Sequence, residues 1–357
     1  MLASARSVTP TIVHVTAATL REWQIFWEEC PTSTYFHSPE WAQVWAAYSS
    51  NRIRPEPKLV YFSDGAQALL PLCFEVKAGG LLSRYASSTQ ATYGGWLSRQ
   101  PLHITHAERL VHWLTRGHGR SLVWRLNPYD ELAFRAGVLE GLACKKDETH
   151  ALRLPESEDA LMKGFKSSYR TQIRKAARSG FSIGEATTED DWREYFAVYQ
   201  DSLVRWGDAP ESGYGWRLFE TMFRLRSPNI KLWLARHAGR VVSGDLCLYA
   251  KNHVSYWHGS TLEGHLKSGV AKLVKYEVMK DAVRRGLAWY DFNPSAGLSG
   301  VKFFKEGFNA IALPAPVVYV DTPLKRLARS CAASVQLDYA RLSLQPLSEL
   351  IEQRPAF

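Results

Sequence analysis

Three strand patterns follow one another in the second half of the chain, and they limit how that half can fold. They occupy residues 230–239, 240–252 and 253–261. Short turns divide them, at Ala238-Gly239 and Lys251-Asn252. Connections this short join antiparallel neighbours, so the segment predicts a β-meander. Helix patterns lie on both sides of the meander, at residues 188–207 and 268–286, so this half is expected to combine a sheet with helices.

The length of the chain indicates two domains. At 357 residues it exceeds the size at which one hydrophobic core stops growing, roughly 250 to 300 residues. In the first half, a hairpin pattern at residues 58–76 surrounds the turn Ser63-Asp64-Gly65. Both halves mix helices and strands in a similar order, which suggests a weak structural repeat.

We therefore predict an α/β (α+β) fold with two tandem domains, each a mixed sheet flanked by helices. The predicted limits are residues 1–150 for the first domain and residues 151–321 for the second. A C-terminal helical tail, residues 322–357, is expected to join the first domain.

The charge of the chain suits an anionic partner. Its 44 basic and 35 acidic residues leave a net charge of +9, which fits a phosphate-bearing cofactor, a tRNA or a membrane surface. Five scattered cysteines form no C-x-x-C pair, which argues against a disulfide framework and a zinc knuckle. No metal site is predicted. With neither a signal-peptide pattern nor a run of about 20 apolar residues, a cytoplasmic location is expected.

A basic stretch at residues 163–178 is the first candidate binding feature, with six basic residues and no acidic one. Most of them recur at three- or four-residue spacing and would share one helix face. The candidates for binding donor phosphates are Arg170, Arg174 and Lys175. Like charges at this spacing destabilise a helix by about 0.2–0.5 kcal/mol per pair, which an anionic ligand would relieve. The alternative is a solvated basic face, or one paired with the acidic helix at residues 188–194.

A second candidate lies before the helix pattern at residues 268–286. Gly264 and Gly269 precede that helix, and a helix N-terminus can hold phosphate with its free N–H groups. Lys267 would add charge beside Gly269, and Lys272 and Lys275 follow. An ordinary helix capped by Ser268 explains the same residues.

Chemistry is expected near residues 286–310, where a buried strand breaks into a Gly/Ser loop and resumes in VKFFKEGF. Lys302 and Lys305 would face opposite sides of a strand but share one side of a helical turn. A lysine in a partly apolar setting can stabilise a tetrahedral oxyanion or hold a diphosphate. The alternative is a lysine whose stem lies on a phenylalanine and whose ammonium reaches water.

His258 is a candidate general base on the third meander strand, although a lone strand histidine is more often a packed residue. Neither a G-x-S-x-G elbow nor a Rossmann or Walker glycine pattern occurs. Hydrolase, kinase and dehydrogenase functions therefore lack their usual motifs.

Four motifs, in order, resemble the second domain of the Fem-type (FemABX) aminoacyltransferases of the GNAT superfamily. They are SYRTQIRKAARSG, RWG, AVRRGLAWYDF and VKFFKEGF, spread over about 150 residues. The early segment FHSPEWAQVW is similar to the N-terminal helix entry of the family. The resemblance implies two GNAT-like domains with a cleft between them, and transfer of an amino acid from aminoacyl-tRNA to an amine of a cell-wall precursor.

The resemblance also implies roles for single residues. Phe304 and Lys305 match a Phe-Lys pair at the tRNA acceptor end, whose lysine steadies the tetrahedral intermediate. Arg205 in RWG is a candidate for holding substrate phosphates. Gln43 stands where cell-wall enzymes of the family carry a lysine that contacts a nucleotide diphosphate, which puts a muropeptide nucleotide in doubt. The acyl-CoA pattern Q/R-x-x-G-x-G/A is half met, since Leu266 replaces its polar first residue.

These observations predict an amide-forming acyltransferase with no tightly bound cofactor. The expected catalytic residues are Lys305, Phe304 and His258. The expected donor-binding residues are Arg170, Arg174, Lys175, Arg205, Lys267, Gly269 and Lys302. An acceptor cleft is expected at Trp41, Gln43 and Asn127. Aminoacyl-tRNA is the first choice of donor, and an amine of a small molecule or of a cell-envelope precursor is the expected acceptor. The alternatives are an acyl-CoA-dependent N-acyltransferase of a sugar or polysaccharide precursor, and a catalytically silent GNAT-like module that binds RNA or another anion.

Overall fold

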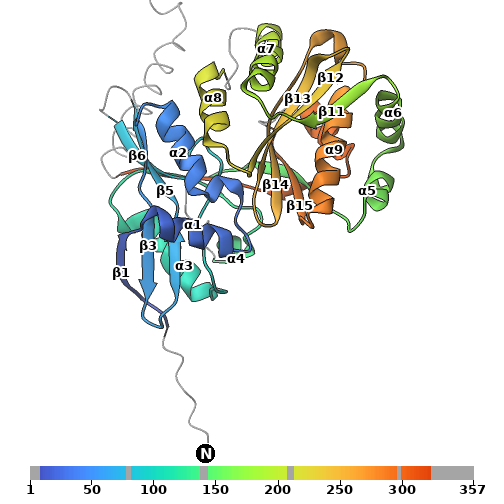
Figure 1. Cartoon of the computed structure of the whole chain (residues 1–357). Coiled ribbons are helices and arrows are strands. Elements are labelled where there is room, and N and C mark those ends of the chain that lie inside the picture. Colours follow the sequence, from blue (N-terminus) through green and yellow to red (C-terminus); the bar gives the residue numbers. More distant parts are fainter. Residues whose placement is uncertain (1–8, 78–81, 137–143, 207–212, 296–298, 323–357) are drawn as a thin grey trace, which may run out of the picture.

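The computed structural model describes residues 9–77, 82–136, 144–206, 213–295 and 299–322 of the chain. Two seven-stranded mixed sheets organise it, and helices pack against both (Figure 1). The predicted fold class, mixed sheets flanked by helices in tandem, is confirmed. No described helix is both long enough and apolar enough to cross a membrane. The predicted helical tail lies almost wholly outside the described residues.

The first half contains nine strands and several helices among its described residues. Its elements are β1 (Ile12–Ala17), α1 (Leu20–Glu29), η1 (Tyr35–His37), α2 (Pro39–Tyr48), β2 (Ile53–Pro55), β3 (Lys58–Phe62), β4 (Gln67–Leu70), β5 (Leu72–Lys77), β6 (Leu82–Ser87), β7 (Tyr93–Gly94), α3 (Ile104–His112), η3 (Trp113–Gly117), β8 (Leu122–Leu126), α4 (Glu131–Arg135) and β9 (Cys144–Lys145). A sheet with strand order β2-β5-β6-β8-β17-β9, and β7 beside β8, forms its centre. A smaller sheet, β1-β3-β4, lies beside it.

The second half forms the other large sheet. Its elements are β10 (Glu148–Arg153), α5 (Glu158–Gly164), α6 (Ser167–Ala177), β11 (Phe181–Glu185), α7 (Glu189–Trp206), α8 (Trp216–Leu225), β12 (Ile230–His237), β13 (Arg240–Tyr249), β14 (His253–Thr261), η4 (Glu263–His265), α9 (Val270–Arg284), β15 (Trp289–Pro294), α10 (Ser299–Glu306), β16 (Ile311–Pro314) and β17 (Val317–Val320). The strand order is β11-β12-β13-β14-β15-β10-β16, and β12, β13 and β14 form the predicted antiparallel meander. Strand β17 returns to the first sheet, between β8 and β9.

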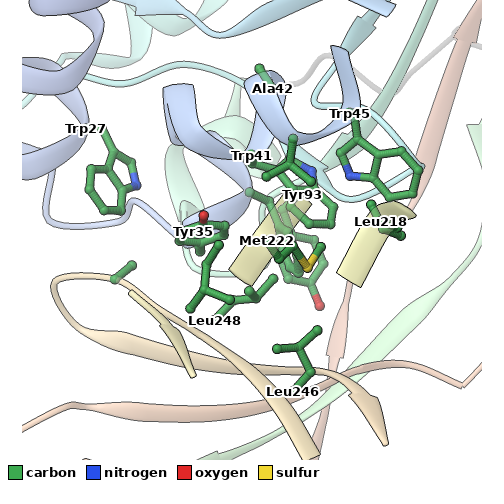
Figure 2. Close-up of a cluster of buried hydrophobic side chains, with 14 of the residues drawn as sticks. Trp27, Tyr35, Trp41, Ala42, Trp45, Tyr93, Leu218, Met222, Leu246 and Leu248 are labelled. Carbon is green, nitrogen blue, oxygen red and sulfur yellow. The ribbon is translucent and has the colours of Figure 1, made fainter. Parts of the chain in front are cut away.

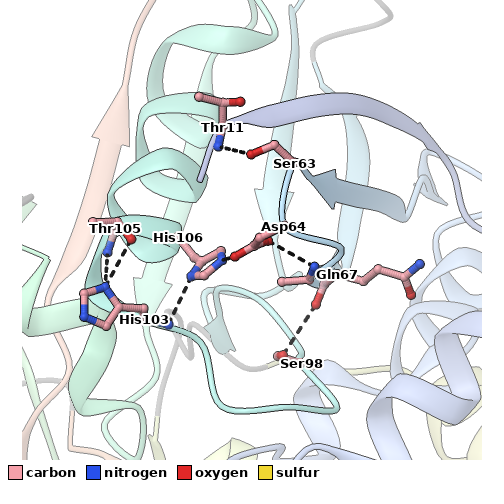
Figure 3. Close-up of polar contacts among 9 residues, drawn as sticks. Thr11, Ser63, Asp64, Gln67, Ser98, His103, Thr105 and His106 are labelled. Atoms are coloured by element: carbon pink, nitrogen blue, oxygen red, sulfur yellow. Dashed lines mark hydrogen bonds and ion pairs between the residues drawn. The ribbon is translucent and has the colours of Figure 1, made fainter. Parts of the chain in front are cut away.

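The predicted hairpin is present as β3 and β4, and polar contacts fix its turn (Figure 3). Gly65 has φ +87°, a left-handed conformation that glycine adopts readily. Asp64 accepts a hydrogen bond from the backbone N–H of Ala66 at 3.1 Å and meets His106 Nε2 of α3 at 2.9 Å. The turn is thus tied both to itself and to the helix that covers this sheet.

Helix termini carry the expected caps in the first half. Thr19 and Glu22 form a capping box at the start of α1, and Ser38 caps α2, where Pro39 takes the first helical position. The two helices then bury large aromatic side chains on one face.

One hydrophobic core cluster spans both halves of the chain (Figure 2). Trp41 and Trp45 of α2 lie near Leu218 and Met222 of α8 in this cluster. Trp41 also meets Trp257 of β14 edge-on, with ring centroids 5.5 Å apart. Aromatic packing therefore joins the first half to the face of the second sheet that α7 and α8 cover.

Helices α5, α6 and α10 contain the two segments whose local structure the sequence did not settle. The basic stretch at residues 163–178, expected on one helix face, is divided between α5 and α6, because Phe165 turns to an extended backbone and buries its ring. After α6 the chain turns at Gly180, whose φ of +76° glycine adopts readily. The segment that holds Lys302 and Lys305, left open between strand and helix, is helix α10.

Candidate functional site

A cavity opens where the parallel strands β14 and β15 stop pairing. The two strands pair only from His253 to Ser255 on β14, opposite Trp289 to Asp291 on β15, although both continue further. The cavity has a volume of about 390 Å³. Its lining comes from α7, β13, β14, α9, β15 and α10, and includes Arg205, Asp245, Tyr256, Lys275, Phe304 and Lys305.

Lys305 enters this cavity from the last turn of α10. The side chain is 3% exposed, and its Nζ donates to the Ser295 hydroxyl at 2.8 Å and to the Asn293 carbonyl at 2.5 Å. Burial lowers the pKa of Lys305 to about 8, against a smaller raising effect of Asp291. No ion pair joins Lys305 to a carboxylate within the described part of the chain. The ammonium is thus fixed by neutral oxygens and keeps its charge for a ligand.

A second lysine, Lys275 of α9, forms a buried ion pair at the cavity wall. Its Nζ lies 3.0 Å from both carboxylate oxygens of Asp245, a residue of β13, and 3.9 Å from the ring centroid of Tyr256. Burial works against the charge of Lys275, yet the Asp245 carboxylate outweighs it and raises the pKa of this lysine. Gly259 lies so close that a Cβ there would stand 2.5 Å from an oxygen of Asp245. The pair forms a packed wall of the cavity.

Arg205 reaches the cavity from the end of α7. Its guanidinium pairs with Asp201 at 3.1 Å and donates to the Ser202 hydroxyl and the Thr261 carbonyl. The predicted phosphate-binding arginine therefore does lie in the same cavity as Lys305, with its orientation set by its own helix and by β14.

Phe304 forms the apolar side of the cavity. The backbone carbonyl of Phe304 accepts a hydrogen bond from the Tyr169 hydroxyl of α6 at 3.0 Å. The ammonium of Lys272 lies over the rings of both Tyr169 and Phe304, at 4.8 and 5.3 Å from their centroids. Helices α6, α9 and α10 thus meet around the predicted Phe-Lys pair.

The structure corrects the role expected of His258. A bulge at Trp257 resets the alternation of β14, so Tyr256 lines the cavity while His258 points to the aromatic side chains of α7 and α8. Burial lowers the pKa of His258 to about 3, and its Nδ1 lies 2.6 Å from the Tyr195 hydroxyl. It lies on the other face of the sheet from Lys305 and is not placed to take a proton there.

None of the three residues predicted for an acceptor cleft lines the Lys305 cavity. Trp41 is 1% exposed and donates from Nε1 to Thr92. Asn127 is buried and bonds the backbone at Thr32 and Tyr129. Gln43 lies half-buried on α2. Trp41 and Asn127 therefore serve packing and chain turns at their own positions, and a role of Gln43 at an acceptor stays a prediction.

Most of the predicted phosphate-binding cations also lie outside the Lys305 cavity. Arg170 donates to the carbonyls of Phe165 and Lys163 and so caps the end of α5. Arg174, Lys175 and Lys267 are exposed. Gly269 is the left-handed cap of α9 and packs on α6, where a Cβ would meet the Gln172 carbonyl at 3.0 Å. Lys302 pairs with Glu148 at 2.6 Å on the outer face of α10.

Asp245 was not predicted as a site residue, and Lys275 was expected only as added charge beside a phosphate-binding helix N-terminus. The available signal was a single carboxylate inside the apolar strand β13, since a lone buried charge requires a partner. Within the described residues, no group of three potential metal ligands comes together.

Known proteins share this fold. Residues 164–306 match the family model of an acetyltransferase (GNAT) domain. The crystal structure of FemX is similar over 88% of this chain and 99% of its own, with a TM-score of 0.67 and 13% identity. L-PGS from Bacillus licheniformis is similar over 85% of this chain and 92% of its own, with a TM-score of 0.53 and 13% identity. No curated protein matches the chain significantly.

The chain has the Fem-like GNAT fold. The predicted resemblance is thereby confirmed, and the acetyltransferase domain model supports acyl transfer as the class of reaction. In this Fem-like fold, the matched region begins at the last residue of α5 and ends at the last residue of α10, so it contains every residue that lines the Lys305 cavity.

Proposed function

We propose that the protein is an amide-forming acyltransferase that moves an activated acyl group to an amine of a small molecule or cell-envelope precursor. The observation that carries the proposal is the buried ammonium of Lys305, held in a cavity by neutral oxygens and left without a carboxylate partner there. A fixed positive charge in a water-poor site stabilises negative charge that develops during a reaction far better than in water.

In the proposed reaction, the nitrogen of the acceptor amine attacks the carbonyl carbon of an ester or thioester and a C–N bond forms. The carbonyl oxygen becomes an oxyanion, which the Lys305 ammonium stabilises. Collapse of this intermediate breaks the C–O or C–S bond to the donor. The proton of the amine passes to the departing oxygen or sulfur. We assign the role of proton acceptor to the substrate's own leaving group, because His258 is buried on the opposite face of the sheet.

We propose aminoacyl-tRNA as the donor. Its support is the row of exposed cations on and around α6, among them Lys166, Arg174 and Lys175. Lys166 lies over the ring of Phe303, one residue before the cavity residue Phe304, so the row begins beside α10. Acyl-CoA is the alternative, which the description of the matched domain as an acetyltransferase favours.

The central test compares Lys305→Ala with Lys302→Ala in an acyl-transfer assay read by mass spectrometry. Both variants remove one lysine from α10, but only Lys305 lines the cavity. Loss of a positioned oxyanion donor lowers turnover about 10²- to 10³-fold, so Lys305→Ala should show that loss and Lys302→Ala should not. Full turnover by Lys305→Ala would remove the proposed catalytic role.

The donor is tested separately by binding. Affinity for tRNA led by phosphate contacts should fall steeply as salt rises. Tight binding of acyl-CoA that is insensitive to salt would reverse the choice of donor. Anion binding without transfer from any aminoacyl-tRNA or acyl-CoA would favour a catalytically silent module.

A further inference from the structure

Asn293 lies where β14 and β15 separate, and its backbone is irregular for a strand residue. Its φ is +60°, in the left-handed region, whereas regular strand residues have negative φ. Ala151 of β10 lies opposite Asp291 of β15. Two positions from Ala151 along β10, Thr149 lies opposite Pro294, which is three positions from Asp291 along β15. Between these pairs one residue of β10 faces two of β15, which is a β-bulge that contains Asn293.

Three features hold Asn293 in this conformation. Its side-chain Nδ2 donates to the Tyr256 carbonyl at 2.7 Å, and its backbone N–H donates to the Asp291 carboxylate at 2.7 Å. Pro294 follows, and a proline disfavours the right-handed helical region for the residue before it. Asparagine is also one of the few residues besides glycine that adopt the left-handed region readily. The residue type and its surroundings therefore favour the same backbone conformation.

The bond to Tyr256 crosses the gap between the two parallel strands. Backbone pairing of β14 with β15 ends at Ser255 and Asp291, and Tyr256 already lines the cavity. Asn293 lies two residues beyond Asp291, and its side chain makes the connection to β14 there. The side chain of Asn293 thus joins the two strands at the point where the cavity begins.

The bulge also sets the direction of the Asn293 carbonyl. In a regular strand, backbone carbonyls point along the sheet and pair with a neighbouring strand. The Asn293 carbonyl instead accepts a hydrogen bond from Lys305 Nζ of α10 at 2.5 Å. The Ser295 hydroxyl is the second acceptor, at 2.8 Å. One of the two oxygens that fix the ammonium therefore depends on the backbone conformation of residue 293.

We propose that Asn293 is a positioning residue for acyl transfer, because its left-handed backbone aims the carbonyl that holds the Lys305 ammonium in the cavity. A role in acyl transfer rests on the proposed function, whereas the contact with Lys305 does not. Alanine at position 293 lacks both the tolerance for left-handed backbone and the bond to Tyr256, and Pro294 directs it to the extended region. Its carbonyl would turn back towards the sheet and leave Lys305.

NMR of the full chain with lysine labelled with ¹³C at Cε tests the contact without an activity assay. In Asn293→Ala the pKa of Lys305 should fall from about 8 by about one pH unit, because the buried ammonium loses an oxygen that favours its charged form. Asn293→Gly keeps the left-handed backbone and should leave the pKa near 8. Asn51→Ala is the matched control, since Asn51 has φ 61° and lies exposed outside the cavity.

The neighbouring charged groups are the same residues in all these variants. A change in the pKa of Lys305 therefore reports the contact with residue 293 rather than a lost charge. The titratable and charged groups that face Lys305 are Asp147, His150, Arg205, Lys275, Asp291 and Lys302.

The rate of acyl transfer is the second readout. Asn293→Ala should lower turnover at least about tenfold, because a displaced catalytic group loses most of its effect. The pH at which the rate falls should move down together with the pKa of Lys305. Asn293→Gly should restore most of the turnover, which a loss of the side chain alone would not explain.

Three NMR results would overturn the proposal. An unchanged pKa in Asn293→Ala would mean that the carbonyl does not hold Lys305. An equal fall in Asn293→Ala and Asn293→Gly would assign the effect to the side chain instead of the backbone. A rise towards 10.5 would mean that Asn293 only keeps water from Lys305.

The two proposals fail on different results. A lowered pKa with unchanged turnover in Asn293→Ala would remove the positioning role in acyl transfer. Full turnover by Lys305→Ala would remove the proposed function, while a lowered pKa in Asn293→Ala would still support the contact. Circular dichroism checks that each variant is folded. If Asn293→Ala does not fold, Asn293→Ser carries the same comparison with Asn293→Gly, since serine also adopts the left-handed region less readily than asparagine.

Discussion

The hydroxyl of Tyr129 donates a 2.7 Å hydrogen bond to the carboxylate of Asp291, and this contact joins the first half of the chain to β15. Asp291 is fully buried and also accepts from the Thr149 hydroxyl at 2.7 Å and from the backbone N–H of Asn293. Asn293 in turn supplies the carbonyl that holds Lys305. A continuous series of hydrogen bonds thus links the interface between the halves to the ammonium of Lys305.

Replacing Tyr129 with phenylalanine should lower the free energy of unfolding by about 1–3 kcal/mol, because the buried Asp291 carboxylate loses a donor without gaining water. Urea unfolding followed by circular dichroism measures the change. Tyr319→Phe is the control, since Tyr319 is 39% exposed on β17. Equal effects of the two substitutions would mean that the Tyr129 bond adds nothing to stability.

The buried pair Asp245–Lys275 should be sensitive to the loss of one partner. Lys275→Met leaves the Asp245 carboxylate uncompensated, and breaking a buried ion pair in this way costs about 3–5 kcal/mol. The double variant Asp245→Leu, Lys275→Met should recover much of that loss. Chemical unfolding of both variants gives the comparison. A double variant as unstable as Lys275→Met would contradict this account of the pair.

A glycine beside this pair gives a sharper test of the cavity wall. A Cβ at Gly259 would stand 2.4 Å from the Tyr256 hydroxyl and 2.5 Å from Asp245, so Gly259→Ala must displace one of them. We expect overpacking to cost about 1–3 kcal/mol in thermal or chemical unfolding. Gly264→Ala is the matched control, since nothing lies within 4 Å of a Cβ there. Equal stability of the two variants would show that Tyr256 or Asp245 can move aside with no loss in the free energy of unfolding.

Local signals in the sequence predicted much of the fold. The turns at Ser63-Asp64-Gly65 and Ala238-Gly239 carry their own conformational preference, so the hairpin and the meander follow from short segments. The return of β17 to the first sheet has no such signal, because its partners lie far away in sequence. Long-range pairing is decided by packing rather than by local preference.

The candidate site was predicted only in part. Lys305, Phe304 and Arg205 were each predicted from a sequence motif, and all three line one cavity. His258 was misplaced because a single-residue bulge inverts which face a strand residue takes, and no pattern in β14 marks the bulge. Trp41 was misplaced because a large aromatic side chain fits a buried interface as well as a ligand groove.

The titration of Lys305 should be visible in both activity and stability. Only the protonated lysine stabilises an oxyanion, so the acyl-transfer rate should fall as pH rises through about 8, the lowered pKa of Lys305. Lysine labelled with ¹³C at Cε, observed by NMR, gives that pKa directly, and the signal lost in Lys305→Met assigns it. A pKa near 10.5 would contradict the link between rate and burial.

The same pKa shift makes folding depend on pH with a definite sign. Burial lowers the pKa of Lys305 from 10.5 in the unfolded chain to about 8 in the folded one, so between these values the unfolded chain holds more protons. The contribution of Lys305 to stability should therefore increase as pH rises from about 8 to about 10.5, and be least favourable below pH 8.

Lys305→Met removes this buried charge and should stabilise the protein at pH 7 by about 1–2 kcal/mol. This gain is smaller than the full pKa shift implies, because Ser295 and Asn293 lose their hydrogen-bond donor. Urea unfolding at pH 7 and pH 10 measures the difference between the variant and the unaltered chain, which should shrink at the higher pH. A constant difference at both values would mean that Lys305 is solvated, and the oxyanion role that rests on its burial would lose its physical basis.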